Sequence, residues 1–150
     1  MFGHDRFAFE FQKEFSDREL IFSEGDAGRE LYIIQEGEIV IEKKSAQGPI
    51  ILATFRKGDV VGEMSLLESR PRFASAYAKG PTRVLVIKAG GFLLKIRRDP
   101  TFAFELLQSL SMRIRVTNER LLEAARLGNL GPELLAEVLS INESSVLEKP

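Results

Sequence analysis

The most informative part of the chain consists of two neighbouring runs, Gly62-Glu63-Met64-Ser65-Leu66 and Pro71-Arg72-Phe73-Ala74-Ser75-Ala76. Gly62 lets the backbone approach a ligand closely, and the residues after it can form one helical turn whose unpaired N–H groups attract an anion. Arg72 adds a permanent positive charge with a planar fork that fits two phosphate oxygens. The carboxylate of Glu63 only accepts hydrogen bonds, so a ribose hydroxyl is a suitable partner. The two runs therefore predict a site for a phosphate joined to a sugar.

The order and spacing of these residues resemble the phosphate-binding cassette of cyclic nucleotide-binding domains. In that family the glutamate binds the ribose 2′-hydroxyl, while the arginine and the backbone amides of the short turn hold the cyclic phosphate. The resemblance implies these roles for Glu63 and Arg72. The alternative, a hairpin loop with a solvated Glu–Arg pair, does not account for the length of the match. The binding residues implied in the cassette are Gly62, Glu63, Met64, Ser65, Arg72, Phe73 and Ala74.

One residue departs from the family pattern. The residue after the arginine is commonly Ala, Ser or Thr, and here it is Phe73. Its amide can still donate a hydrogen bond, but its side chain has no hydroxyl for the phosphate and can form an apolar wall near the sugar. One alternative is that Phe73 fills the phosphate space, which would leave a dimerisation module with a vestigial pocket. We expect Arg72 itself to be a surface side chain that contributes little to the core.

The composition excludes most catalytic chemistry. The chain has 150 residues, of which 44% are hydrophobic and 29% are charged, as is ordinary for one globular core with an appended helix. It has no cysteine and one histidine, so disulfides, a cysteine nucleophile and a Cys/His zinc site are excluded. We see no Asp/Glu cluster with calcium-loop spacing. We therefore expect no metal, no cofactor and no enzymatic activity, because hydrolysis of a cyclic phosphodiester requires a metal or an acid–base pair.

The charge and the apolar pattern restrict the partners. A net charge of −1 does not favour nucleic-acid binding by this chain. The first residues lack the order of a secretory signal, and no apolar run reaches the length of about 18 residues that a membrane span needs. We therefore expect a cytoplasmic protein that contacts neither nucleic acid nor membrane.

Periodicity predicts a mainly β fold. In residues 5–14 and just beyond, Phe7, Phe11 and Phe15 recur every four residues, which predicts a short N-terminal amphipathic helix. From residue 19 on, short apolar runs separated by glycine turns predict an antiparallel sandwich or barrel. The runs around Gly25 and Gly37 resemble the opening strands of cyclic nucleotide-binding domains, which implies a jelly-roll barrel (double-stranded β-helix) over residues 19–87. The expected strands are residues 20–22, 31–34, 38–41, 50–55, 74–78 and 83–87.

Two helices are expected to follow the strands. The first covers residues 89–98, and the second covers residues 100–127, with Pro100 in its first turn and Gly128 as its cap. Steps of three and four place a heptad seam on the second helix, which favours a parallel homodimer over docking onto the barrel of the same chain. The seam consists of Leu107, Leu110, Ile114, Thr117, Leu121 and Ala124. This organisation gives a cyclic nucleotide-binding domain over residues 1–127 and a short helical tail over residues 128–150.

The second helix also resembles the dimer helix of the catabolite activator family around Val116 to Arg120. In that family a threonine and the serine after it contact the adenine amino group, one from each subunit. The resemblance implies this role for Thr117 and Asn118, and it favours cAMP over cGMP as the ligand. The alternative is that Thr117 bonds to its own helix and Asn118 faces water.

The tail faintly resembles the start of a helix-turn-helix unit. After Gly128 its only basic residue is Lys149, whereas DNA binding needs several phosphate contacts. A helix that folds back or binds a partner is the better interpretation. We therefore expect a non-catalytic sensor of cyclic nucleotides in signal transduction, with a downstream protein partner that the sequence does not identify. The alternative is the effector domain of a catabolite-activator-like regulator without its DNA-binding module.

Overall fold

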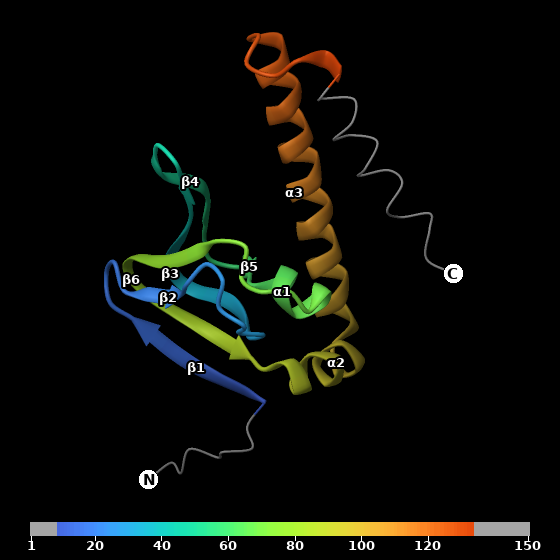
Figure 1. Ribbon diagram of the computed structural model, residues 1–150. Coiled ribbons are helices and arrows are strands. Elements are labelled where there is room, and N and C mark those ends of the chain that lie inside the picture. Colours follow the sequence, from blue (N-terminus) through green and yellow to red (C-terminus); the bar gives the residue numbers. More distant parts are fainter. Residues whose placement is uncertain (1–8, 134–150) are drawn as a thin grey trace. The chain divides into compact units, whose positions relative to one another are not determined.

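The computed structural model describes residues 9–133 of the chain (Figure 1). Two compact units are present, one that ends at Ala103 and one that begins at Phe104. Of the elements in the described residues, the strands and two short helices belong to the first unit, and most of a long helix belongs to the second. Among the described residues no helix is both long and apolar enough to cross a membrane.

The first unit is built on antiparallel strands. Its sheet has six strands in the order β1-β6-β3-β4, with β2 paired to β6 and β5 paired to β3. The strands are β1 Glu10–Phe15, β2 Leu20–Phe22, β3 Leu31–Ser45, β4 Gly48–Phe55, β5 Val60–Val61 and β6 Ser75–Ile87. Figure 1 shows β3 and β6 side by side at the centre of this unit. The expected fold class, antiparallel β with flanking helices, is confirmed.

The N-terminal segment corrects one expectation. Residues 10–15 form β1, which pairs with β6 along its whole length, so the helix expected over residues 5–14 is wrong where the structure describes it. A spacing of four suits a helical turn, but it is also twice the period of a strand. Phe9, Phe11 and Phe15 all occupy odd positions, and Phe9 fits only the strand period. Phe15 is 5% exposed and joins the core.

In two cases, a pair of strands expected separately forms one continuous strand in the structure. Residues 31–34 and 38–41 both belong to β3, and residues 74–78 and 83–87 both belong to β6. Gly37, expected in a turn, lies inside β3 with φ 83°, where the register between β3 and β6 shifts. A Cβ atom at Gly37 would lie 2.4 Å from the carbonyl oxygen of Pro81. Glycine is required there because the neighbouring backbone comes too close for any side chain.

The core of the first unit is formed mainly by buried side chains of the paired strands β3 and β6. It continues through β5, which leads directly into α1 (Glu63–Glu68). The site predicted from the sequence is therefore attached to the most buried part of the sheet. The buried members of the core cluster are Phe15, Tyr32, Ile34, Ile39, Val61, Ala76, Ala78, Val84 and Val86.

The two later helices lie where the sequence predicts them. Helix α2 covers Ala89–Arg98, and α3 covers Pro100–Arg126. The Oδ1 atom of Asp99 accepts a hydrogen bond of 3.1 Å from the amide of Phe102, which caps the start of α3. Gly128, with φ 78°, follows the end of α3, as expected of a helix cap. The helical tail expected over residues 128–150 falls outside the described residues from 134 on.

A first prediction concerns Gly37. We expect Gly37→Ala to lower the free energy of unfolding by more than the roughly 1–2 kcal/mol that a left-handed residue costs by itself, because the new Cβ also meets the backbone of β6. Gly58→Ala is the matched control, since Gly58 has φ 91° and open space around its Cβ position. Urea unfolding of both variants measures the difference. Equal losses would show that the contact between β3 and β6 at Gly37 is unimportant.

Candidate functional site

Gly62 connects the core strand β5 to the short helix α1. Its backbone is left-handed, with φ 90° and ψ 5°. A Cβ atom there would lie 2.7 Å from Nη1 of Arg72 and 2.8 Å from the carbonyl oxygen of Glu30. Both the conformation and the space therefore require glycine, and the atom nearest to the missing Cβ position is Nη1 of Arg72.

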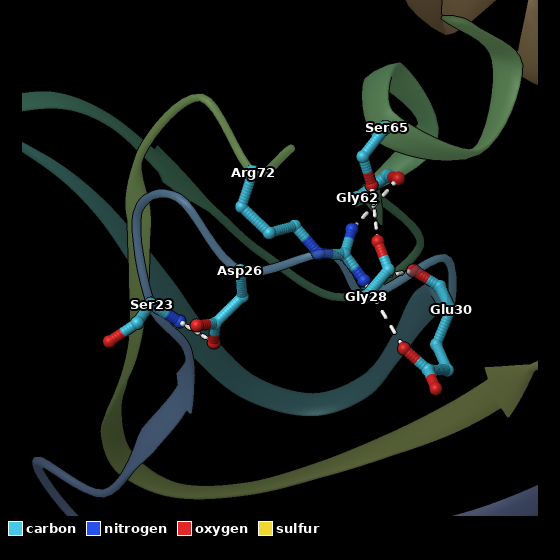
Figure 2. Close-up of polar contacts among 7 residues, drawn as sticks. All are labelled: Ser23, Asp26, Gly28, Glu30, Gly62, Ser65 and Arg72. Carbon is cyan, nitrogen blue, oxygen red and sulfur yellow. Dashed lines mark hydrogen bonds and ion pairs between the residues drawn. The ribbon is translucent and has the colours of Figure 1, made fainter. Parts of the chain in front are cut away.

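Arg72 is buried, contrary to expectation. The residue is 3% exposed, and its guanidinium donates from Nη1 to the carbonyl of Gly62 (3.1 Å) and from Nη2 to the carbonyl of Glu30 (2.8 Å). The carboxylate of Glu30 lies 3.4 Å from Nη2, a long ion pair (Figure 2). The ring of Phe22 lies 4.3 Å from the guanidinium carbon. The surface position predicted for Arg72 is wrong because the loop between β2 and β3 folds over it.

One edge of the guanidinium keeps hydrogen-bonding capacity. Its Nε atom is buried and has no hydrogen-bond partner among the described residues. The Nε and Nη2 atoms face Gly28, where a Cβ atom would lie 3.3 and 3.2 Å from them. A side chain at position 28 would crowd both donors. The arrangement leaves one donor unused and another in a long ion pair, at the edge with which arginine binds two oxygens of an anion.

Burial also changes the acid–base properties of the site. Removal from water lowers the pKa of the Arg72 guanidinium, while the negative charges of Glu30, Asp26 and Glu63 and the nearby Tyr32 oppose this change. Burial raises the pKa of the Tyr32 hydroxyl. Arginine starts from so high a value that the guanidinium remains charged at neutral pH. The site therefore holds a buried positive charge surrounded by acceptors.

Helix α1 contributes the other predicted cassette residues. Glu63 and Ser65 are buried at 5% and 4% exposure, whereas Met64 is 50% exposed. The hydroxyl of Ser65 donates to the carbonyl of Gly28 over 2.9 Å, which ties α1 to the loop between β2 and β3 (Figure 2). The Ser65 side chain thus stabilises the cassette by holding α1 against this loop, a role that the sequence did not indicate.

The chain around Arg72 pairs with the same loop. The amide of Gly25 donates to the carbonyl of Arg72, and the amide of Arg72 donates to the carbonyl of Asp26, both over 2.8 Å. The amide of Glu24 donates to the hydroxyl of Ser75 over 2.9 Å. Residues 24–26 and 72–75 are therefore fixed against each other like two short strands.

Phe73 does not lie among the partners of Arg72. The residue is 55% exposed, and the ammonium of Lys43 lies 4.0 Å from the centre of its ring. Ala74, the next residue, is 4% exposed. Gly28, Glu30 and Lys43 were all missed from the sequence, because their relevance depends on chain segments that meet only in the fold.

The predicted base-binding residues belong to the second unit, which is described by itself. Thr117 and Asn118 lie on α3, where Thr117 is exposed and Asn118 is partly buried. Their contribution to a ligand site stays a prediction. Among residues 9–133, no group of three or more His, Cys, Asp or Glu side chains is arranged to hold a metal ion.

The fold and the cassette together define a ligand-binding domain of the regulatory type. Residues 12–99 match the family model of the cyclic nucleotide-binding domain. This is more than half of the chain, and the chain therefore belongs to the cyclic nucleotide-binding domain family.

Similar proteins agree with this assignment. The chain is 36% identical over 96 residues to the cyclic AMP receptor protein of Thermus thermophilus. The matched segment covers 63% of this chain and 44% of that protein. The crystal structure of the Thermus thermophilus catabolite activator protein has a TM-score of 0.66 and 26% identity, and the match covers 95% of this chain and 83% of that chain. The co-crystal structure of the regulatory domain of Toxoplasma gondii PKA with cAMP has a TM-score of 0.57 and 26% identity. This match covers 70% of this chain and 40% of that chain. The chain spans less than half the length of the curated relatives it matches.

A second prediction concerns the structural role of Arg72. We expect Arg72→Ala to lower the free energy of unfolding by about 3 kcal/mol or more, because it leaves buried carbonyls without a donor. Arg56→Ala is the control, since Arg56 forms an exposed pair of 3.5 Å with Glu38 and such pairs contribute little. Denaturant unfolding compares the two variants. Similar small losses in both would show that the buried contacts of Arg72 are dispensable.

Proposed function

We propose that this chain is a non-catalytic sensor domain that binds cAMP in preference to cGMP. The observation that carries the proposal is the buried guanidinium of Arg72. Its Nε atom has no partner among the described residues, while its Nη2 atom donates to the carbonyl of Glu30 and makes a long ion pair with the carboxylate of the same residue. A cyclic phosphate offers two oxygens to that edge and replaces the carboxylate of Glu30, which is the more exposed and weaker partner. The membership of the family and the names of the similar proteins support a cyclic nucleotide as the ligand.

We propose partners for the remaining parts of the ligand, and the family resemblance supports them. Glu63 takes the ribose 2′-hydroxyl, and the amides of the α1 turn and of residues 73 and 74 take the phosphate. Thr117 and Asn118 of α3 take the adenine amino group, which is the reason for preferring cAMP. The phosphate binds where α1 and the loop between β2 and β3 are tied together, so binding changes the stability of both segments at once.

We further propose that α3 pairs with α3 of a second copy. Leu107 and Ile114 of the predicted seam are 64% and 57% exposed on the single chain. Apolar residues that repeat in steps of three and four along 27 residues of helix are typical of a coiled-coil seam. The output of such a dimer is a separate protein or domain. One candidate is a DNA-binding module of the catabolite-activator type, because this chain spans only 44% of the Thermus receptor.

Calorimetric titration tests the proposed ligand. We expect the purified chain to bind cAMP more tightly than cGMP. It should bind linear AMP weakly, because the ring of a cyclic phosphate fixes its oxygens relative to the ribose, whereas a linear phosphate rotates about its single ester link. Equal binding of cAMP and cGMP would overturn the base preference alone. Absence of binding of either cyclic nucleotide would overturn the sensor function.

A third prediction concerns Gly28. We expect Gly28→Ala to weaken cAMP binding by about tenfold or more, since a Cβ atom crowds the Nε and Nη2 donors of Arg72. Folding should change little, because contacts of 3.1–3.3 Å from the new Cβ atom require the side chains of Glu30 and Arg72 to shift by only a small distance. Gly131→Ala is the control, as nothing lies within 4 Å of its Cβ position. Unchanged affinity in Gly28→Ala would place the phosphate elsewhere.

A fourth prediction concerns the dimer. We expect Ile114→Asp to convert the protein to monomers, because two carboxylates would face each other in an apolar seam. Sedimentation measures the mass of the wild type and of the variant. Glu119→Gln, a change outside the predicted seam, serves as the control. A monomeric wild type would contradict the proposed pairing of α3.

A further inference from the structure

Lys43, on β3, contacts residues on both sides of the cassette loop. Its Nζ atom donates to the Oε1 atom of Glu24 over 2.7 Å and to the backbone carbonyl of Phe73 over 2.8 Å. It also lies 4.0 Å from the centre of the Phe73 ring, in a cation–π contact. An ammonium group has three N–H donors, and the two hydrogen bonds use two of them while the charge faces the ring. Lys43 is therefore engaged by the cassette itself.

Glu24 holds the ammonium in place. Its second oxygen, Oε2, accepts a hydrogen bond of 3.2 Å from the backbone amide of Lys44, so both carboxylate oxygens are bound to neighbouring lysines of β3. These hydrogen bonds lower the pKa of the Glu24 carboxyl, which stays ionised at neutral pH. The side chains of Lys43 and Glu24 are 34% and 25% exposed, so the pair is partly shielded from water. The Lys43–Glu24 pair is thus held by its own hydrogen bond, by the carbonyl of Phe73 and by the amide of Lys44.

The contact with the Phe73 carbonyl determines the direction of the next amide. In a trans peptide the C=O and the following N–H lie in one plane and point in opposite directions, and the described residues contain no cis peptide. The carbonyl of Arg72 is held by the amide of Gly25, and the carbonyl of Phe73 is held by Lys43. Two successive peptide planes are therefore fixed. The N–H groups of Phe73 and Ala74 point away from Gly25 and Lys43.

We propose that Lys43 is a positioning residue for phosphate binding. Through the carbonyl of Phe73 it orients the amide of Ala74, and through the ring it keeps Phe73 away from the phosphate space. Lys43 and Phe73 act as a pair: the aromatic ring supplies no hydroxyl for the ligand, but it completes the set of contacts that fixes the backbone donor. This inference rests on the proposed binding of a cyclic nucleotide.

A fifth prediction follows for cAMP affinity. We expect Lys43→Met, which keeps the apolar stem and removes the ammonium, to weaken cAMP binding about tenfold or more, the effect typical of losing a charge-assisted hydrogen bond. Lys43→Arg retains a cation and donors and should restore most of the affinity. Lys44→Met is the matched control on the same strand, because the hydrogen bond from Lys44 to Glu24 comes from the backbone amide, which the substitution leaves in place. Glu24→Gln gives a second test that leaves Lys43 in place, and we expect a smaller loss.

Two readouts separate positioning from a general structural role. Thermal unfolding of Lys43→Met should stay close to that of the wild type, since a partly exposed ion pair contributes little to stability. In amide NMR spectra of the free protein, Lys43→Met should shift the Ala74 amide signal and leave that of Gly62 in place. Wild-type affinity in Lys43→Met, or an unmoved Ala74 signal, overturns the role of Lys43 while the sensor function stands. Failure of the wild type to bind any cyclic nucleotide overturns both.

Discussion

The cassette depends on a buried guanidinium that satisfies backbone carbonyls from two separate chain segments. Arg72 bonds to Gly62, at the start of α1, and to Glu30, at the start of β3, and it lies against the ring of Phe22. Removing a charge from water is costly unless it is paired, so the surrounding acceptors must stay in place while the arginine is buried. The same contacts that stabilise the fold therefore hold the proposed phosphate donor ready.

Several residues around the Arg72 guanidinium are suited to its burial. Gly62 and Gly28 both lack a side chain where a Cβ atom would meet the guanidinium at 2.7 and 3.2 Å. The loop between β2 and β3 pairs with the backbone of Arg72, and the hydroxyl of Ser65 fastens α1 to that loop. The charged group thus organises the loop, the strand and the helix around itself.

The sequence predicted the structure well where residues close together in the chain decide it. The bounds of α2 and α3 followed from Pro100, Gly128 and apolar spacing, and the cassette followed from the order of Gly62, Glu63 and Arg72. The N-terminal helix was wrong because a four-residue spacing is compatible with both a strand and a helix, and pairing with β6 decided between them. The burial of Arg72 and the role of Lys43 were beyond sequence reasoning, because both depend on contacts between residues far apart in the chain.

The short length of α1 has a consequence for how the state of the site can be observed. Six residues are too few for a helix to persist in water without support, since the first turn fixes several dihedral angles for a single hydrogen bond. Left-handed residues flank α1 at Gly62 and Ser69, so the helix cannot lengthen to gain stability. Its amides should therefore exchange with solvent at a rate set by the contacts around Arg72 and Ser65. Hydrogen exchange of α1 alone would report how firmly the whole cassette is assembled.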